Sequence, residues 1–390
     1  MSMARKIRMG MVGGGKGAFI GAVHRMAASL DGKIELVAGA FDIDPERGKL
    51  MGDELCLDHS RVYGTYKEMI EKELALPASK RVDFVSVVTP NNWHFPISKD
   101  FLEAGFNVLC EKPMTMSLAE AIGLENIVKK SGKTFALMHN YTAYPMVKLA
   151  KDMVKCGDLG TVRKVIVIYP QGWLARPIEK QGQQQASWRT DPKQSGAGGC
   201  IGDIGSHSEN LAEYITGLKI TEVCAELTSF IEGRPVDDDA NCLLRFDNGA
   251  KGVLHTSQIS IGEENGLSIW VHGTDASIEW HQEHPNQLLF KKLDAPVEIL
   301  SRGNPYVAAK SPAAARATRV PSGHPEGFLE AFANNYKNFA ETILLKEEAK
   351  EVDPLVNDFP SVAEGIRGMA FIEAAIANSK NNEKWTKLKH

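Results

Sequence analysis

The sequence predicts an α/β protein built from a doubly wound parallel sheet, followed by an α+β domain with a large, mainly antiparallel, open-faced sheet. Strand and helix patterns alternate through the first third of the 390 residues, which is the arrangement that right-handed βαβ units require. Beyond residue 140, strand patterns follow one another with short turns between them, as in an antiparallel sheet. The predicted domains are therefore 1–139 and 140–390.

The elements expected in the first domain alternate in type. Strands are expected at Ile7–Val12, Ile34–Phe41, Val82–Val88, Asn107–Leu109 and Phe135–His139, and helices at Val23–Leu30, Tyr66–Leu74, Ile97–Ala104 and Leu118–Lys130. The strand patterns are short and apolar, and several are rich in β-branched residues, as buried parallel strands are. Gly105 suits the C-cap of the helix before it.

Strand patterns dominate the second domain after a helix at Pro145–Cys156. They lie at Val162–Tyr169, Glu222–Glu232, Asn241–Phe246, Gly252–Ile261, Leu267–His272, Ala276–Trp280 and Gln287–Leu293. Asp247-Asn248-Gly249 between two of them is a strong hairpin signal. Two late helices are expected at Glu326–Leu345 and Ser361–Ser379, and Glu179–Gly199 is expected to be a long loop. Loops of that length are often functional.

Composition excludes several classes of protein. Apolar residues make up 43% and charged residues 24% of the chain, which is typical of globular domains and not of disordered, collagen-like or coiled-coil chains. The formal net charge of −4 gives no general attraction for nucleic acid or anionic membranes. No stretch approaches the ~20 apolar residues of a transmembrane helix. Met1–Met11 has no apolar signal-peptide core, so we expect a cytoplasmic protein without nucleic-acid or membrane partners.

The cysteines and two polar clusters predict neither a cysteine-based site nor a metal site. The 6 cysteines are scattered and form no CxxC pair, which argues against zinc-ribbon and thioredoxin-like sites, so we expect reduced, mostly buried thiols. His281 and His284 have no evident third ligand, so no metal site is expected. Asp237-Asp238-Asp239 is interpreted as a solvated turn and not as a calcium loop.

A glycine-rich segment follows the first expected strand and opens the first expected helix. Glycine lets the backbone approach a pyrophosphate, whose charge then lies on the N–H groups of the helix N-terminus. Gly13, Gly15 and Ala18 match the GxGxxG/A pattern, or alternatively Gly21 is the third glycine of a lengthened loop. In the first βαβ unit, with an acid after the second strand, this motif indicates a Rossmann dinucleotide-binding domain. The cofactor contacts expected here are Gly13, Gly15, Lys16, Gly17, Ala18, Phe19 and Ile20.

Asp42 ends the second expected strand. A carboxylate at this place accepts hydrogen bonds from the adenosine ribose hydroxyls and repels a 2′-phosphate. The next residue, Ile43, is not basic, so NAD is favoured over NADP. Asp42 could instead cap the following helix, but Asp44 before Pro45 suits that role better. We therefore expect Asp42 to remain free for the cofactor.

Thr89, Pro90, Asn91 and His94 follow the strand Val82–Val88. They lie at the carboxyl end of the strand, where open α/β sheets bind ligands. We interpret them as cofactor contacts. The alternative is an ordinary Pro-Asn turn.

Glu111-Lys112-Pro113 follows the strand that starts at Asn107. A residue before proline is held extended, which would direct the Lys112 ammonium into the cleft at the end of the sheet. Glu111 and Lys112 are expected to contact the cofactor, and Lys112 also the substrate. The alternative for Lys112 is a surface lysine.

Asp203 and His207 form the most informative pair outside the glycine loop. If the segment is helical, the two residues are one turn apart on the same face. A carboxylate beside an imidazole orients it and raises its basicity, which suits a proton acceptor near neutral pH. Glycines before the pair would let a substrate approach closely. The alternative is a polar helix start that packs by chance.

Other polar and aromatic residues are candidates for substrate binding. Arg189 could bind polyol hydroxyls or form a structural ion pair, and Trp173 could stack on the face of a sugar ring. Asn140 and Tyr141 end the last strand of the first domain, where they could contact nicotinamide or substrate. His324 stands at a helix start.

Four motifs occur in a fixed order along the chain: a glycine loop ending in Gly21-x-x-His24, Thr89-Pro90-Asn91-x-x-His94, Glu111-Lys112-Pro113, and Gly202-Asp203-x-Gly205-x-His207. Together they resemble the glucose–fructose oxidoreductase / inositol dehydrogenase / rhizopine-catabolism family (Gfo/Idh/MocA). The resemblance spans residues 7–215 by motif and the whole chain by length and layout. The lengthened glycine loop departs from the family's pattern.

The resemblance implies an N-terminal Rossmann NAD(P)-binding domain and a C-terminal α/β domain whose open sheet covers the cleft and forms oligomer contacts. Members mostly oxidise or reduce a carbon–oxygen bond of a sugar or cyclitol. Carried over by motif, Lys112, Asp203 and His207 correspond to the family's catalytic lysine, aspartate and histidine. His207 would take the hydroxyl proton, Asp203 would orient His207, and Lys112 would stabilise charge on the reacting oxygen. A homodimer or homotetramer is expected.

Three functions are compatible with these motifs. The favoured one is an NAD-dependent sugar or cyclitol dehydrogenase. The second keeps tightly bound NAD(H) for internal redox cycling, such as glycoside cleavage or sugar–sugar oxidoreduction. The third is a non-catalytic sugar or nucleotide sensor, against which the presence of Lys112, Asp203 and His207 together argues. The sequence does not name the substrate.

Overall fold

The computed structural model describes residues 5–390, so the first four residues of the segment Met1–Met11 lie outside it. The chain divides into two compact units, one of Met1–Met138 with Phe332–Gly365 and one of His139–Ala331 with Ile366–His390. The first division falls next to residue 139, where the sequence predicted a boundary. Phe332–Gly365, which the sequence assigned to the second domain, packs with the first unit.

The first unit is built on a parallel sheet. Its strands are β1 (Ile7–Gly13), β2 (Ile34–Ala40), β3 (Phe84–Val88), β4 (Asn107–Glu111) and β5 (Phe135–Met138). Their order is β2-β1-β3-β4-β5, and all neighbours are parallel. The order reverses between β1 and β3, and ligands of open α/β sheets bind at the carboxyl ends of strands beside such a reversal.

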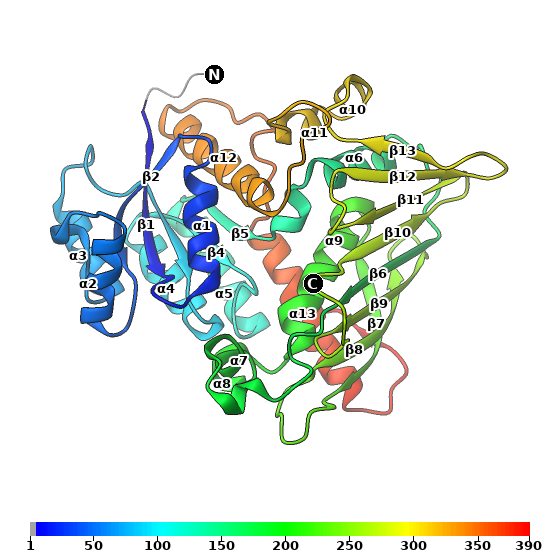
Figure 1. Ribbon diagram of the computed structural model, residues 1–390, viewed down its shortest axis with the longest axis horizontal. Helices are drawn as coiled ribbons and strands as arrows, with labels where there is room; N and C mark the ends of the chain where they lie inside the picture. The colour runs from blue at the N-terminus through cyan, green and yellow to red at the C-terminus, as the bar shows by residue number, and fades with distance from the viewer. Residues whose placement is uncertain (1–4) are drawn as a thin grey trace. The chain divides into compact units, whose positions relative to one another are not determined.

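Helices complete the first unit (Figure 1). They are α1 (Phe19–Ser29), α2 (Pro45–Glu54), η1 (His59–Arg61), α3 (Tyr66–Ala75), η2 (Asn91–Trp93), α4 (His94–Glu103), α5 (Leu118–Ser131) and most of α12 (Phe328–Glu347). Asp44 caps α2 by accepting the Glu46 N–H, as predicted. Tyr336 and Phe339 from α12 pack around the buried Phe84 of β3, which explains why this late helix belongs to the unit.

The second unit contains a nine-stranded sheet in the order β13-β12-β11-β10-β6-β9-β8-β7-β14. The strands are β6 (Lys164–Pro170), β7 (Ile220–Thr228), β8 (Asp239–Phe246), β9 (Lys251–Ser257), β10 (Ser268–His272), β11 (Ala276–His281), β12 (Gln287–Lys292), β13 (Glu298–Ser301) and β14 (Thr386–Lys387). Neighbours are antiparallel except for the parallel pair β6 and β9. The predicted Asp247–Gly249 hairpin joins β8 to β9, with Gly249 at a φ of 89°.

Helices cover one face of this sheet. Figure 1 shows α6 (Pro145–Lys155), α9 (Ser206–Thr216) and α13 (Val362–Ser379) on the same side. The strand side chains alternate accordingly, since Val165, Val167 and Tyr169 of β6 are buried and their neighbours are partly exposed. The remaining helices are η3 (Asn140–Ala143), η4 (Ile178–Gln181), α7 (Gln184–Arg189), α8 (Pro192–Ser195), η5 (Ile201–Gly205), α10 (Pro305–Lys310) and α11 (Pro312–Ala317).

Two expectations for the second unit were wrong. The segment Glu179–Gly199 is not an unstructured loop, because η4, α7 and α8 occupy much of it and Asp191 caps α8 at the Lys193 N–H. Asp238 is not in a solvated turn: it is 0% exposed and accepts hydrogen bonds from Arg234 and the backbone of Phe230. Three consecutive aspartates suggested a segment in contact with solvent. In the structure, Asp238 is instead paired with Arg234 and Phe230, which precede it in the chain. Within residues 5–390, no helix has the length and apolar character needed to cross a membrane.

Candidate active site

The glycine loop between β1 and α1 has the backbone conformation of a phosphate-binding turn. Gly13, Gly14 and Gly17 have φ values of 82°, 73° and 85°, which L side chains rarely adopt. A Cβ on Gly21 would lie 2.4 Å from the Gly14 Cα and one on Gly15 would lie 2.7 Å from the Phe41 carbonyl oxygen. Gly21 therefore has the close helix–strand packing role of a third glycine, as the lengthened-loop alternative proposed.

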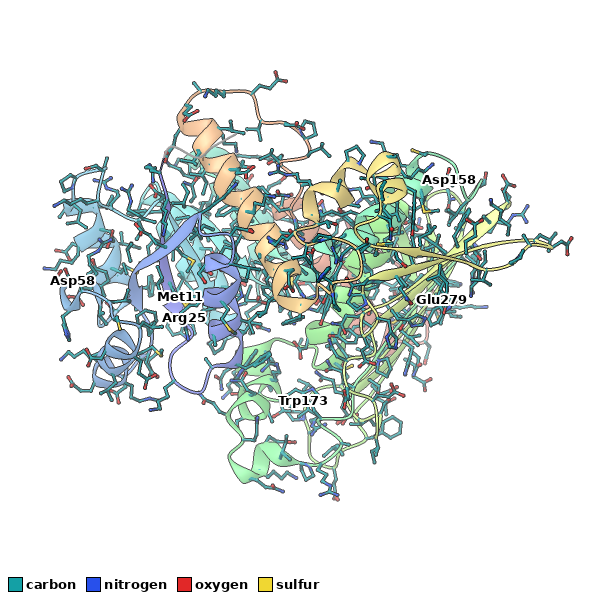
Figure 2. The ribbon with its side chains drawn as sticks, turned by 45° about the horizontal axis from the view of Figure 1, so that its top comes forward. Met11, Arg25, Asp58, Asp158, Trp173 and Glu279 are labelled. Carbon is teal, nitrogen blue, oxygen red and sulfur yellow. The ribbon has the colours of Figure 1, made fainter. Side chains whose placement is uncertain are left out.

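Arg25 holds this loop from α1, and the sequence did not single it out. Its guanidinium donates to the Gly14 carbonyl oxygen at 2.7 Å and contacts the Met11 sulfur at 3.4 Å. Figure 2 shows the Arg25 and Met11 side chains next to each other. Burial lowers the pKa of Arg25. Of the predicted cofactor contacts in this loop, Lys16 is exposed and pairs with Glu54 at 3.2 Å, and Phe19 is 63% exposed.

Asp42 lies at the end of β2 as predicted, but it is not free. Its carboxylate accepts the Asp44 N–H at 3.1 Å and pairs with the Arg47 guanidinium at 3.2 Å. The basic side chain near Asp42 does not come from the next residue but from Arg47, which the first turn of α2 brings back to the strand end. The carboxylate that was predicted to bind the ribose and a basic side chain are thus adjacent.

The turn after β3 contains His94, whose side chain is 0% exposed. Nδ1 lies 2.7 Å from the Pro113 carbonyl oxygen and Nε2 lies 2.9 Å from the Thr89 carbonyl oxygen. Burial lowers the pKa of His94, although both carbonyl groups oppose that shift. This histidine, a predicted cofactor contact, ties the β3 turn to Pro113.

Two buried polar atoms in this turn have no hydrogen-bond partner among residues 5–390: the Thr89 hydroxyl and the Asn92 side-chain oxygen. Buried polar groups are nearly always paired in folded proteins, so these atoms fit contacts to a polar ligand. Pro90 and the buried Asn91 belong to the same turn. Together with the glycine loop, these groups are the candidates in the first unit for contacts to a dinucleotide.

Glu111 and Lys112 follow β4. Both Glu111 carboxylate oxygens are engaged inside the unit, one with His24 at 2.7 Å and one with the Lys112 backbone N–H at 3.1 Å. Its carboxylate is bonded to these two groups in the structure, and the cofactor contact of Glu111 stays a prediction. Lys112 is partly buried at the start of a cis Lys112-Pro113 bond.

The second unit places Asp203 and His207 on a continuous helical segment. Asp203 lies in the π-helical turn η5 and His207 in the first turn of α9. The segment is helical, as the i, i+4 argument assumed, but the π-helical turn has a different hydrogen-bond spacing from the α-helix on which that argument was based. Such π-helical turns are frequent at functional sites.

Asp203 is held by two side chains. Its Oδ2 lies 3.3 Å from the Arg189 Nε and accepts a hydrogen bond from Gln258 at 2.9 Å. The Arg189 guanidinium also lies over the Trp188 ring at 4.2 Å and 5.9 Å from the ring centre of Trp173. The predicted substrate residues Arg189 and Trp173 therefore lie together, with Arg189 directly beside the predicted catalytic carboxylate.

His207 is buried among aromatic rings. Its Nδ1 lies 3.4 Å from the His139 Nδ1, and its ring centre lies 4.7 Å from that of Tyr141. The Tyr141 hydroxyl bonds to the Tyr169 hydroxyl at 2.6 Å, and Asn265 donates to Tyr141 at 3.2 Å. Burial raises the pKa of Tyr169 well above its ordinary value, so this hydroxyl stays protonated. His139 was missed because sequence spacing carries no information about contacts between distant segments.

Asn140 and His324 have contrasting surroundings. Asn140 is 2% exposed, and its side-chain nitrogen has no hydrogen-bond partner in the described part of the chain, which fits a ligand contact. His324 is exposed, and its Nδ1 lies 3.3 Å from the Ser322 carbonyl oxygen. Both residues were predicted to contact the substrate. They differ in burial, since Asn140 is buried and His324 is exposed.

Asp237 is a further residue that the sequence analysis misread. It accepts the Gly199 and Ile201 N–H groups, each at 2.7 Å, immediately before the helical segment that carries Asp203. A Cβ on Gly199 would lie 2.2 Å from the Asp237 carbonyl oxygen, so only glycine fits there. Burial raises the pKa of Asp237 to about 6.

All 6 cysteines are free thiols, of which Cys110, Cys200 and Cys242 are buried, Cys224 is intermediate, and Cys56 and Cys156 are exposed. Among the described residues, 5–390, no cluster of three or more His, Cys, Asp or Glu side chains could hold a metal ion.

Comparison with protein families gives two matches. Residues 7–139 match "Oxidoreductase family, NAD-binding Rossmann fold", and residues 147–279 match "GFO/IDH/MocA C-terminal domain". The chain is also 33% identical to "Uncharacterized oxidoreductase YfiI" of Bacillus subtilis (strain 168), with 99% of this chain and 98% of that protein covered.

Solved structures of two proteins are similar to this chain over almost their whole length. An oxidoreductase from Sinorhizobium meliloti is 44% identical, with a TM-score of 0.87 and coverage of 98% of this chain and 100% of that one. An inositol dehydrogenase homologue from Azotobacter vinelandii in complex with NAD+ is 35% identical, with a TM-score of 0.93 and coverage of 99% and 98%. The same homologue with NADH and myo-inositol has a TM-score of 0.91 at 34% identity and the same coverage.

Proposed function

Because the chain belongs to the Gfo/Idh/MocA family of NAD-binding oxidoreductases, we propose that it oxidises a secondary hydroxyl group of a sugar or cyclitol to a carbonyl group. The likeness to a homologue solved with NADH and myo-inositol supports a cyclitol as the first substrate to test. The roles of individual residues below belong to the same proposal.

The observation that carries the proposal is the buried imidazole of His207 with its Nδ1 facing His139 at 3.4 Å. An imidazole is a suitable proton acceptor near neutral pH. When Nδ1 carries the proton that is shared with His139, the basic lone pair of His207 is at Nε2. We assign this Nε2 as the atom that accepts the proton of the substrate hydroxyl.

Asp203 and Lys112 supply charge. The Asp203 carboxylate, fixed by Arg189 and Gln258, favours the imidazolium that His207 becomes when it accepts the proton. The Lys112 ammonium donates a hydrogen bond to the reacting oxygen and stabilises the negative charge that develops there. Bound NAD supplies the hydride acceptor.

The first unit fits the cofactor through its glycine loop and through the unpartnered Thr89 and Asn92 side-chain oxygens. We assign Asp42 to the ribose hydroxyls, with NAD as the cofactor. In the second unit, the unpartnered Asn140 amide and the Arg189 guanidinium are donors for a polyol, and Trp173 offers an aromatic face. Tyr141 and the exposed His324 complete the proposed substrate contacts.

The test is absorbance at 340 nm with NAD, and separately with NADP, against myo-inositol and a panel of other inositols, aldoses and glycosides. NADH formation with one polyol class supports the dehydrogenase and defines its substrate class. The proposal is contradicted if the protein binds NADH but produces no NADH from NAD with any polyol of the panel. Product formation from a glycoside without net NADH would instead support internal redox cycling with a tightly held cofactor.

We also propose a homodimer or homotetramer. Apolar side chains such as Leu243 of β8 and Ile299 of β13 are 47% and 56% exposed on the large sheet, and burying such side chains favours association. Light scattering coupled to size-exclusion chromatography measures the mass directly. A monomer across micromolar concentrations contradicts this part of the proposal. The cytoplasmic location stays a prediction.

A further inference from the structure

A buried polar network in the first unit ends at the backbone of Lys112. Its members come from four separate elements: His24 from α1, Ser86 from β3, Glu111 from the end of β4, and Tyr336 from α12. None of these side chains has a part in the proton and charge transfers assigned above.

The network consists of short hydrogen bonds. His24 Nε2 lies 2.7 Å from a Glu111 carboxylate oxygen, and His24 Nδ1 lies 2.6 Å from the Tyr336 hydroxyl. The Tyr336 hydroxyl lies 2.8 Å from the Ser86 hydroxyl. The exposed fractions are 0% for His24, 0% for Ser86, 1% for Tyr336 and 7% for Glu111. Hydrogen bonds in such dry surroundings are strong, and breaking one leaves a costly unpaired group.

Aromatic packing fixes the imidazole ring further. The ring centre of His24 lies 5.1 Å from that of Phe332 and 5.7 Å from that of Tyr336, both in edge-to-face contact. Tyr336 in turn packs against Phe84 of β3. These contacts hold the His24 ring of α1 in one position against α12.

Glu111 connects this fixed imidazole to Lys112. One carboxylate oxygen is held by His24 and the other accepts the Lys112 N–H at 3.1 Å. Burial alone would raise the pKa of Glu111, but the hydrogen bond and charge of His24, with the charge of Lys112, lower it below its usual value. The carboxylate is thus an anionic bridge between α1 and residue 112.

We propose that His24 and Tyr336 are positioning residues, which act through Glu111 to fix the Lys112 backbone relative to α1. The glycine loop leads directly into α1, so the network sets the place of the ammonium relative to the proposed pyrophosphate site. Displacing a reacting group by about 1 Å costs roughly 100-fold in rate. This inference rests on the proposed function, because it gives Lys112 the electrostatic role stated there.

Three substitutions test the network. His24→Leu removes both hydrogen bonds, Tyr336→Phe removes only the hydroxyl, and His24→Gln keeps a donor toward Glu111. We expect kcat to fall roughly 10- to 100-fold in His24→Leu and less in Tyr336→Phe, with the dissociation constant for NADH little changed. His24→Gln should recover most of the loss in kcat. The substrate is whichever polyol the 340 nm assay identifies, with myo-inositol first.

Tyr63→Phe is a matched control in the same unit. The Tyr63 hydroxyl donates to the buried Glu73 carboxylate at 2.7 Å, so its loss also removes a hydroxyl from a buried acid. Tyr63 hydrogen-bonds to the backbone of Gly39 on β2, an edge strand separated from β4 by two others. This variant should lose stability as Tyr336→Phe does, and keep its kcat.

Hydrogen exchange gives a readout that does not depend on activity. The amide of Lys112 should exchange faster in His24→Leu and Tyr336→Phe than in the unsubstituted protein and Tyr63→Phe, with exchange in β1 unchanged. If His24→Leu does not fold, Tyr336→Phe and His24→Gln still carry the test.

Unchanged kcat and unchanged Lys112 exchange in the folded variants would refute the positioning role. An equal loss of kcat in Tyr63→Phe would show that lowered stability alone explains the effect, which also refutes it. Lys112→Ala separates a failure of this inference from a failure of the proposed function. If Lys112→Ala turns over normally, the proposed role of Lys112 is wrong. If Lys112→Ala loses activity but the network variants turn over normally, only the positioning role is wrong.

Discussion

The Asp237 carboxylate accepts the backbone N–H of Ile201 at 2.7 Å. Ile201 begins the π-helical turn that carries Asp203 and continues into α9 with His207. The second Asp237 oxygen holds Gly199, and the Asp237 carbonyl oxygen accepts the Cys200 N–H at 2.8 Å. Asp237 therefore anchors the start of the proposed catalytic segment at three successive residues.

Asp237 gives a prediction about stability and pH. Its pKa in the folded protein is about 6, raised by burial from 3.8. Because the folded state binds this proton more tightly than the unfolded state, the group favours folding at low pH, and the benefit is lost as pH rises from 3.8 to about 6. A rise in pKa of this size corresponds to about 3 kcal/mol.

The measurement is urea unfolding at pH 4.5, 6 and 7.5 for the unsubstituted protein and Asp237→Asn. The free energy of unfolding of the unsubstituted protein should fall relative to that of Asp237→Asn by about 2 kcal/mol between pH 4.5 and 7.5. A difference between the two proteins that stays constant with pH would show that the pKa of Asp237 is not raised.

Lys112→Ala and His207→Ala should each lower kcat by roughly 100-fold or more, because each removes a group that we propose to act on the reacting hydroxyl. NADH binding, measured by fluorescence titration, should stay nearly unchanged. His255→Ala is a control on the large sheet, where His255 is partly exposed and its Nδ1 lies 2.9 Å from the Asn241 side-chain oxygen. Near-normal turnover in both test variants would contradict the assignment.

Cofactor preference should depend on the Asp42–Arg47 pair. Asp42→Ser removes the carboxylate that we propose to repel a 2′-phosphate and releases Arg47 from its ion pair. The ratio of kcat/KM for NADP to that for NAD should rise roughly 10- to 100-fold, since placing like charges together costs a few kcal/mol. Adding Arg47→Ala to this variant should reverse part of the rise. An unchanged ratio in Asp42→Ser would place the ribose elsewhere.

The effect of Arg189 on activity toward the polyol should depend on the geometry of its guanidinium as well as on its charge. Its Nε lies beside Asp203 while its guanidinium carbon lies over the Trp188 ring at 4.2 Å, and lysine reproduces neither arrangement. Arg189→Lys should lower kcat/KM for the polyol by about 10-fold or more, as expected for a lost hydrogen bond to a charged group. Arg176→Lys, at an exposed position in the same stretch of chain, is the control. Equal activity in both variants would make Arg189 a structural residue only.

Local signals in the sequence were sufficient for several elements. The Asp247–Gly249 hairpin, the Asp44 cap and the alternation of strands and helices depend on neighbouring residues, and the structure has each of them. Motif order also identified the family correctly. The same local reasoning misjudged Asp238, whose partner Arg234 the sequence pattern did not reveal.

The sequence by itself determined the fold class, the cofactor class and the segments that carry polar chemistry, because periodicity, turn residues and glycine positions act over a few residues. Only the tertiary structure decided which polar groups meet: His24 with Glu111 and Tyr336, His207 with His139, and Asp42 with Arg47. The members of each group come from different elements. Their contacts depend on how the helices pack against the sheets, and hydrophobic burial drives that packing without regard to distance along the chain.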